Sequence, residues 1–151
     1  MFKPGEIYSR RTLHQQYGGQ PHNRICTPAE QDMILLFANH HDSQNGNGPY
    51  TSGWTKFGVF RFIGEGRYGH MAFTRGNRAL RDHLTYNKRL HVFVRTGRET
   101  PDRVRYEGEF VYRGHFYKEG HDVRNNMRRM IVFVLKPRNV VPASSVPAAE
   151  R

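Results

Sequence analysis

The sequence has 151 residues, with 24 Lys and Arg against 13 Asp and Glu, and its formal net charge at pH 7 is +11. This length fits one domain with one core. The ten Phe and eight Tyr argue against general disorder. The surplus of positive charge favours DNA, RNA or an anionic membrane as the partner. No apolar run approaches the about 18 residues of a spanning helix, and the single cysteine excludes an internal disulfide and fits a reducing cytoplasm.

The first half of the chain predicts two strands separated by loops. Residues 1–12 predict the start of a helix or a short strand, and 13–26 predict a loop, because glycines, a proline and an asparagine interrupt them. The apolar run at 32–40 predicts a buried strand, and the Gly/Asn-rich stretch 41–49 predicts a loop. Residues 58–66 alternate in polarity and end in glycines, which predicts a strand followed by a turn.

The second half predicts a helix and then more strands. A helix is expected over 74–89, with Asn77 able to cap it and with Leu80 and Leu84 on one face. Strands are expected at 90–96, at 102–117 as one or two, and at 130–137. The pattern predicts a mainly β, α+β domain over 1–137, built as a curved sheet or barrel with one or two helices. The proline-rich residues 138–151 predict a flexible tail.

The motifs of the sequence do not favour catalysis. Nine histidines are present, but His40 and His41 are adjacent, and adjacent side chains of an extended segment point apart. The sequence has no H-E-x-x-H or C-x-x-C motif and no recognisable nucleophile–base pair. We therefore expect a protein that is not an enzyme and holds no metal or cofactor, and a histidine-based nuclease, or a fragment of one, stays an alternative.

Nucleic-acid binding fits the sequence better. Arginine outnumbers lysine, and a guanidinium suits phosphates and guanine edges better than an ammonium does. For any single arginine, a solvated surface position is the alternative. Five aromatic rings lie within residues 50–62: Tyr50, Trp54, Phe57, Phe60 and Phe62. Phe57 and Phe60 are expected in the core, whereas Tyr50 and Trp54 adjoin a polar loop and are suited to stack on a nucleobase.

Five segments in this order resemble the SRA (SET and RING-associated) domain, which binds methylated cytosine in DNA. They are Tyr50–Trp54, Phe62–Gly66, Arg75–Leu80, Leu90–Arg95 and Arg105–Phe110. The resemblance covers about residues 13–136 and is nearest to bacterial SRA-like domains found alone or ahead of HNH nucleases in modification-dependent restriction systems. It implies a PUA-like curved β-barrel with flanking helices, in which the modified cytosine is flipped out of the duplex and held between two aromatic rings.

When the family's functional residues are placed on this sequence by position, the resemblance implies a base pocket and a DNA-contacting surface. Tyr50 and Phe62 correspond to the two rings, Ile63 and Gly64 offer backbone groups to the base edge, and Ser52 takes the place of the usual acidic residue; Trp54 completes the expected pocket. Groove or phosphate contacts are implied for Gln20, His22, Asn23, Arg24, Arg67, Arg75, Asn77 and Arg78. For Asn77, capping of the helix is the alternative.

The expected protein is a monomeric, cytoplasmic, nucleoid-associated reader of double-stranded DNA that contains 5-methylcytosine, and it has no membrane partner. Because Ser52 and Phe62 depart from the family pattern, 5-hydroxymethylcytosine and looser recognition without flipping stay open. A PUA-like reader of RNA or of DNA shape is the second interpretation. Only 14 residues follow residue 137, too few for a metal-dependent nuclease fold, so that a separate nuclease is a possible partner.

Overall fold

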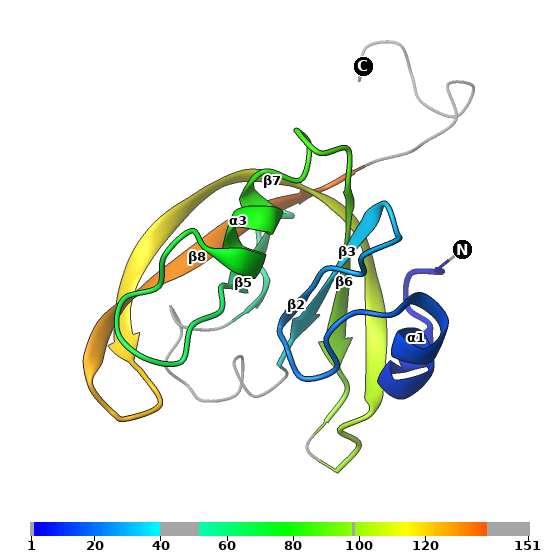
Figure 1. Cartoon of the computed structure of the whole chain (residues 1–151), viewed down its shortest axis with the longest axis horizontal. Helices are drawn as coiled ribbons and strands as arrows, with labels where there is room; N and C mark the ends of the chain where they lie inside the picture. The colour runs from blue at the N-terminus through cyan, green and yellow to red at the C-terminus, as the bar shows by residue number, and fades with distance from the viewer. Residues whose placement is uncertain (1, 40–51, 98, 139–151) are drawn as a thin grey trace.

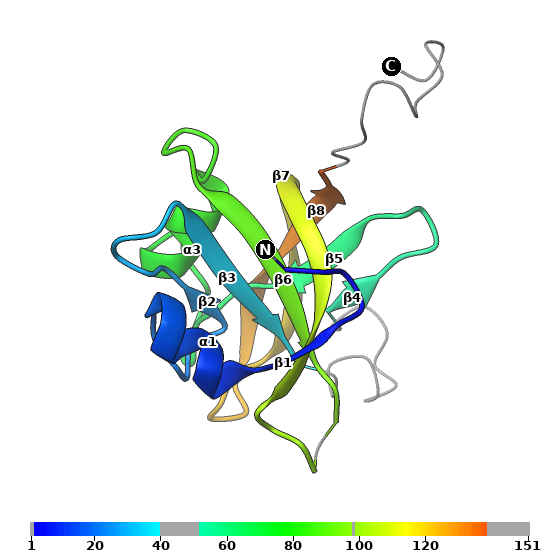
Figure 2. The same cartoon turned by 90° about the vertical axis from the view of Figure 1, so that its right-hand side faces the viewer.

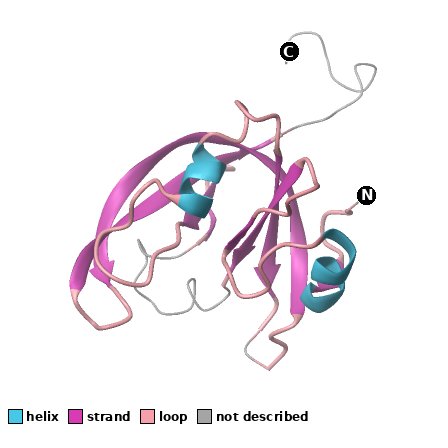
Figure 3. Ribbon diagram, in the orientation of Figure 1, coloured by secondary structure: helices cyan, strands magenta, loops and turns pink. Residues whose placement is uncertain are grey.

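The computed structural model describes residues 2–39, 52–97 and 99–138, which form one sheet and two helices (Figure 1). In chain order the elements are β1 (Ile7–Ser9), α1 (Arg10–Tyr17), β2 (Ile25–Cys26), β3 (Met33–Ala38), β4 (Gly53–Trp54), β5 (Phe60–Ile63), α3 (Arg75–Arg81), β6 (Arg89–Arg95), β7 (Arg103–His121) and β8 (Met127–Pro137). Strands predominate, as Figure 3 shows. The predicted α+β, mainly β architecture is confirmed.

The strands are paired in the order β2-β3-β6-β7-β8-β5-β4, and β1 pairs with β7 outside this path. β3 and β6 are parallel, and the other pairs are antiparallel. Among the described residues the path is open rather than closed into a barrel. The long ribbon of β7 and β8 arches over the molecule (Figure 1). The pairing register shifts between Tyr112 and Gly114, and such a bulge bends the strand that contains it.

The sheet buries two apolar clusters, one on each side of β3. Ile34, Leu36 and Ala38 belong to the larger cluster, with Phe60, Phe62, Leu80, Phe110 and Phe133. Met33, Leu35 and Phe37 belong to the smaller one, with Leu13, Phe93 and Tyr106. This division follows from the strand itself, because successive side chains point to opposite faces. A strand buried on both faces reads as a continuous apolar run, and for this reason the sequence predicted it correctly.

Helix α1 crosses the boundary between two predicted segments. The sequence predicted the start of a helix or a short strand over 1–12 and a loop from residue 13 onward, and the loop prediction is wrong for residues 13–17. The Ser9 side chain caps the helix by accepting a hydrogen bond from the Thr12 amide at 3.3 Å. Leu13 anchors the helix in the smaller cluster, close to the strands that Figure 2 shows behind α1. The prediction failed because the loop indicated by the glycines after the helix was extended back over the last five residues of the helix, 13–17.

Helix α3 is shorter than the predicted 74–89. It begins after Thr74 and ends at Arg81, so that Asn77 lies within the helix and is not its cap. Leu80 is buried in the core, but Leu84 is exposed and lies outside the helix. Asn87 adopts a φ of 56°, a left-handed conformation that does not continue a helix.

The later strands agree with the sequence, and of the one or two strands predicted for 102–117 the structure has one, β7, which continues to His121. The predicted loop at 41–49 and almost all of the tail lie outside the described residues, so that the division into a domain and a tail stays a prediction. No helix in the described part of the chain is long and apolar enough to cross a membrane.

Candidate nucleic-acid interface

The end of β5 holds three of the residues predicted for the base pocket. The Ile63 amide donates a hydrogen bond to the Ser52 hydroxyl at 3.0 Å, and the Gly64 amide donates to the Ile131 carbonyl at 2.8 Å. Ser52 is only 4% exposed. Ser52 therefore lies against Ile63 and its neighbour Gly64, although Ser52 and Ile63 are 11 positions apart in the sequence, and we call these three residues the β5-end site.

Arg24 is the residue before β2, and its side chain extends to the β5-end site. Its Nε donates to the Ile63 carbonyl at 3.2 Å, and its Nη2 donates to the Ser52 hydroxyl at 3.1 Å. The guanidinium carbon also lies 5.3 Å from the centre of the Phe62 ring, within the range of a cation–π contact. A permanent positive charge thus lies against two uncharged oxygen acceptors and one aromatic face.

A second polar cluster follows directly along the chain and fixes the turn after β5. The Asn77 side chain accepts from the Glu65 amide at 2.9 Å and donates to the carbonyls of Glu65 at 2.8 Å and Ala72 at 3.0 Å. The Glu65 carboxylate accepts from the Gly76 amide at 3.1 Å, and burial raises the pKa of Glu65. Asn77 is 2% exposed, so that its predicted contact with DNA is wrong: the amide group is used inside the protein.

Phe62 is the clearest correction within the predicted pocket. Its ring has no exposed surface and packs in the larger core cluster, so that it does not face an open pocket as the sequence analysis expected. Phe60 and Phe62 are two positions apart on one strand and therefore share a face. Because Phe60 was assigned to the core, the same alternation already indicated burial for Phe62.

The other aromatic residues of this segment lie elsewhere. Trp54 pairs with Phe60 at the start of β5, and its ring contacts Phe60 and Phe110. It is therefore at the opposite end of the β4–β5 pair from Ile63. Phe57 is exposed rather than part of the core. Tyr50, the first predicted stacking ring, lies outside the described residues.

The residues predicted to contact DNA divide into exposed and inward-pointing side chains. Gln20, His22, Asn23, Arg67, Arg75 and Arg78 are exposed. Arg24 is half-buried and donates hydrogen bonds inside the protein, which differs from the groove contact expected of it. The exposed side chains stay candidates for phosphate or groove contacts.

An exposed aromatic ring between two arginines was missed by the sequence analysis. Tyr68 is 52% exposed, and the guanidinium carbons of Arg67 and Arg124 lie 5.8 Å and 4.3 Å from its ring centre. Arg128 donates to the carbonyls of Gly66 and Gly69, at 3.1 Å and 2.9 Å, which fixes the loop that carries the ring. The sequence signal was an aromatic residue between Arg67 and a glycine in a turn.

The same loop is tied to the turn between β7 and β8, and the two lie together at the lower left of Figure 1. The Asp122 carboxylate accepts from the Gly69 amide at 2.9 Å, and the Val123 amide donates to the Arg67 carbonyl at 3.0 Å. These contacts join residues more than 50 positions apart in the sequence. An ordered aromatic–cationic tip of this kind can contact a nucleic acid without first losing conformational freedom.

A small cationic cavity lies beside Arg24. It has a volume of about 140 Å³, and its lining includes Arg10, His22, Asn23, Arg24 and Arg95. The Arg10 guanidinium lies 3.9 Å from the centre of the Phe37 ring, and burial lowers the pKa of Arg10. Arginines gathered around one hollow favour an anion over a neutral ligand.

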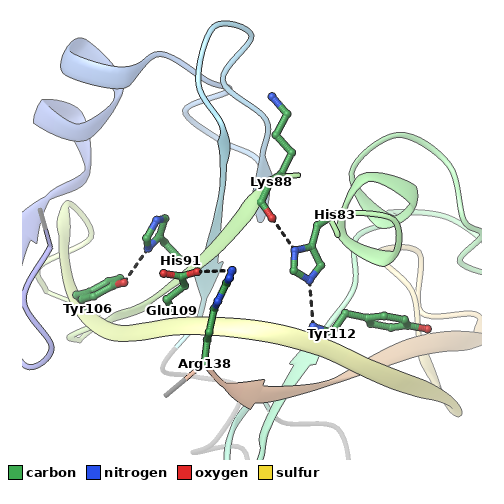
Figure 4. Close-up of polar contacts among 7 residues, drawn as sticks. All are labelled: His83, Lys88, His91, Tyr106, Glu109, Tyr112 and Arg138. Carbon is green, nitrogen blue, oxygen red and sulfur yellow. Dashed lines mark hydrogen bonds and ion pairs between the residues drawn. The ribbon is translucent and has the colours of Figure 1, made fainter. Parts of the chain in front are cut away.

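Two histidines form hydrogen bonds inside the protein (Figure 4). His83 lies between α3 and β6, and His91 lies on β6. His83 Nδ1 lies 2.7 Å from the Lys88 carbonyl, and the Tyr112 amide donates to His83 Nε2 at 3.1 Å, an arrangement that assigns the proton to Nδ1. His91 Nδ1 lies 2.7 Å from the Tyr106 hydroxyl. Burial lowers the pKa of both, that of His91 to about 4. Both rings are therefore neutral at pH 7.

Within residues 2–39, 52–97 and 99–138, no group of three or more His, Cys, Asp or Glu side chains is placed to hold a metal ion. The Cys26 thiol is buried, and burial raises its pKa to about 11. A thiol of this kind is a poor nucleophile at neutral pH.

The open mixed sheet, the arched β7–β8 ribbon and the two helices define an SRA-type fold. A structure of the sulfur-binding and SRA domains of ScoMcrA with phosphorothioated DNA matches with a TM-score of 0.70 and 21% identity over 99% of this chain. The SRA domain of SUVH5 with fully methylated CG DNA matches with a TM-score of 0.62 and 15% identity over 96% of this chain and 93% of its own.

The chain belongs to the family described as "ScoMcrA-like, SRA domain", whose profile matches residues 4–150. A structure of ScoMcrA as a type IV phosphorothioation-dependent restriction endonuclease matches with a TM-score of 0.71 and 21% identity over 98% of this chain. This chain spans 44% and 30% of the two ScoMcrA chains. The comparison with curated proteins gave no match.

Proposed function

We propose that this chain reads modified DNA, and that its target is a 5-methylcytosine in double-stranded DNA. The observation that carries the proposal is the membership of the SRA family over residues 4–150. Support comes from structurally similar chains: the sulfur-binding and SRA domains of ScoMcrA are in a complex with phosphorothioated DNA, and the SRA domain of SUVH5 is in a complex with methylated DNA. The formal net charge of +11 adds the electrostatic attraction that any duplex needs.

The modified base is proposed to leave the duplex and enter at the β5-end site. The Ile63 carbonyl is an acceptor suited to the amino group of cytosine, which is the donor on that base edge. The Ser52 hydroxyl can accept a bond from the same base. Unstacking costs a few kcal/mol, and stacking on one ring recovers about 1–3 kcal/mol. Tyr50 is the ring proposed for this role.

The surface around the site is proposed to bind the phosphates and a groove. The cations assigned to this role are Arg67, Arg75, Arg78 and Arg124, which are exposed. Gln20, His22 and Asn23 lie on the loop next to the cationic cavity and are assigned to the groove. Tyr68 adds a flat, rigidly held ring to this surface.

The chain is proposed to act as a non-catalytic, monomeric reader in the cytoplasm, associated with the nucleoid. Any cutting of the bound DNA is assigned to a nuclease, either a separate partner or another part of the same protein. This assignment rests on the restriction endonuclease in which a similar domain occurs.

Fluorescence anisotropy with sequence-matched duplexes tests this function. The probes are unmodified, 5-methylcytosine, 5-hydroxymethylcytosine and phosphorothioated DNA, together with an RNA duplex, all at one salt concentration. We expect binding of the 5-methylcytosine duplex to be tighter by about tenfold, the equivalent of about 1.4 kcal/mol. Equal affinity for the methylated and unmodified duplexes contradicts the proposal, and a preference for RNA favours the PUA-like alternative. A 2-aminopurine beside the target base reports extrusion by a rise in fluorescence.

A further inference from the structure

A row of aromatic rings with an arginine at each end lies on β7 beyond its bulge, apart from the residues assigned above to DNA. The Arg81 guanidinium carbon lies 4.9 Å from the centre of the Phe73 ring, and the Arg129 guanidinium carbon lies 4.5 Å from that of Tyr117. Between them, the His115 ring centre lies 4.7 Å from Phe73 and 5.4 Å from Tyr117. We call these five side chains the β7 aromatic row. Its arginines come from α3 and β8, and Figure 1 shows the β7–β8 ribbon passing behind α3.

The β7 aromatic row is held against the core on one side and is open on the other. Phe73 packs against the larger cluster, 6.1 Å from the Phe133 ring, and His115 pairs with Phe133 across the ribbon. The Tyr112 hydroxyl lies 2.8 Å from His115 Nδ1 and fixes the imidazole. The Tyr117 ring is 47% exposed. Rings held in this way offer a surface that loses little conformational freedom on binding.

The angles between the rings indicate what this surface fits. Phe73 and His115 are inclined at 66° to each other, and His115 and Tyr117 at 74°. The bases of a duplex are parallel, and unstacking one of them costs a few kcal/mol. The bases of a single strand can each adopt the plane of a separate ring or guanidinium, because they are free to turn outward. The β7 aromatic row therefore fits unstacked bases better than a duplex.

The charge at the row favours a polyanion as the partner. Arg129 is exposed, and its backbone is fixed, because its amide donates to His70 Nδ1 at 2.9 Å and its carbonyl accepts from the Met71 amide at 2.9 Å. A guanidinium stacked on a ring keeps N–H donors at its edge for a phosphate. Arg81 is bound by the Asp82 carboxylate at 2.7 Å and 2.9 Å, which leaves it a stacking role. The net charge of +11 repels a second copy of the chain and attracts a nucleic acid.

We propose that the β7 aromatic row is a second nucleic-acid surface, which binds single-stranded DNA through unstacked bases. DNA is the polyanion with which similar domains occur in complexes. The inference goes beyond the proposed function and does not depend on it, because none of the five side chains belongs to the β5-end site.

The row lies level with the end of β5 and is separated from it by β8 alone. Ile63 pairs with Val132, and Val132 pairs with Phe116, the residue between His115 and Tyr117. One molecule can therefore hold a duplex at the end of β5 and a single-stranded stretch of DNA on β7.

Fluorescence anisotropy with a labelled dT oligonucleotide of about ten nucleotides tests the surface. Tyr117→Ala is expected to weaken binding of this probe by about tenfold, because stacking on one ring is lost. Tyr117→Phe keeps the ring and should bind as the unaltered protein does. The matched control is Tyr86→Ala, which removes another exposed tyrosine and should leave binding unchanged. Unchanged affinity in Tyr117→Ala overturns the proposal.

The salt dependence tests the phosphate contact. Arg129→Gln should lower the salt slope for the dT probe by about 0.7, the value for one phosphate of a single strand. Arg61→Gln is the matched control, because Arg61 lies over the Phe116 ring, 5.3 Å from its centre, and Phe116 points to the opposite face from its neighbours His115 and Tyr117. Equal slopes in Arg129→Gln and the unaltered protein contradict the phosphate contact.

Three further results separate this surface from the proposed function. Tyr50→Ala should leave binding of the dT probe unchanged, and Tyr117→Ala should leave the preference for a methylated over an unmodified duplex unchanged. A Tyr117→Ala protein that loses duplex and single-strand binding equally overturns a distinct surface. Tighter binding of an rU oligonucleotide than of dT overturns the assignment to DNA.

A measurement on the unaltered protein does not depend on the folding of any variant. The ring resonances of His115 and Tyr117 are expected to shift in NMR spectra when the dT probe is added to saturation, whereas that of Tyr86 should not. Rings of the row that do not shift in the saturated complex overturn the proposal. Equal binding of methylated and unmodified duplexes contradicts the proposed function alone, because the dT probe carries no modified cytosine.

Discussion

Two polar clusters adjoin the end of β5, only two residues apart along the chain, and they are built differently. In one, the neutral Asn77 amide exchanges three hydrogen bonds with the backbone of Glu65 and Ala72. In the other, the charged Arg24 side chain uses the Ile63 carbonyl and the Ser52 hydroxyl. The first cluster is a scaffold that fixes the turn after β5 through an uncharged amide, whereas the second holds a charged guanidinium against the end of β5.

The largest effect is expected from breaking the scaffold. Asn77→Ala removes the side-chain partner of the Glu65 amide and of the Glu65 and Ala72 carbonyls, three partly buried bonds, and an unsatisfied buried group costs about 1–3 kcal/mol. We expect the free energy of unfolding to fall by about 3 kcal/mol, measured by urea denaturation. Asn23→Ala at an exposed position is the control and should change it by less than about 0.5 kcal/mol. A stable Asn77→Ala protein would show that the two clusters do not differ in this way.

A pH titration extends the comparison to the neutral histidines of Figure 4. Burial, and then the nearby Arg89 charge, lower the pKa of His91 to about 4, below the value of about 6.5 of an unfolded chain. The unfolded state therefore binds the proton first as the pH falls, and stability is present above pH 6.5 and declines toward pH 4. The expected loss is on the order of 2–3 kcal/mol. His91→Gln should flatten this decline, and an unchanged pH profile in that variant contradicts the assignment.

A smaller effect is expected where the two clusters touch. A Cβ on Gly64 would lie 2.8 Å from Asn77 Oδ1 and 3.1 Å from a carbon of the Phe133 ring. Gly64→Ala should therefore lower the free energy of unfolding by about 2 kcal/mol through overpacking. Gly97→Ala is the matched control, because the nearest atom there is 3.8 Å away. Thermal unfolding of both variants gives the comparison, and equal melting temperatures contradict the close approach.

The sequence predicted the elements whose signal is local. β3 is a continuous apolar run, β6 is apolar except for His91 and its terminal arginines, and β5 alternates before a glycine turn, so that their composition sufficed. The last five residues of α1, 13–17, were predicted as a loop because Gly18 and Gly19 were given more weight than the capping residue Ser9. Ser52, Ile63 and Gly64 were predicted from the family resemblance and lie together at the end of β5, and their role in binding a base stays a prediction.

The features that could not be predicted from the sequence depend on contacts between residues that are far apart along the chain. Arg24 was assigned to the groove, because an arginine in a polar loop has no local signal that it turns inward toward a residue 39 positions away. Asn77 was taken for a cap or a DNA contact for the same reason. The loop that carries the exposed ring of Tyr68 is held by Arg128 and Asp122, which belong to the β7–β8 hairpin. Only the burial of Phe62 could have been inferred from strand alternation.

The 19-residue length of β7 has a consequence for how the molecule unfolds. The strand contributes Phe110 to the larger cluster and Val104 and Tyr106 to the smaller one, and a continuous hydrogen-bonded ribbon does not fray in its middle. Separation of the two halves of the molecule therefore requires the loss of the strand that both share. Amide hydrogens on either side of the sheet should consequently exchange through one cooperative opening.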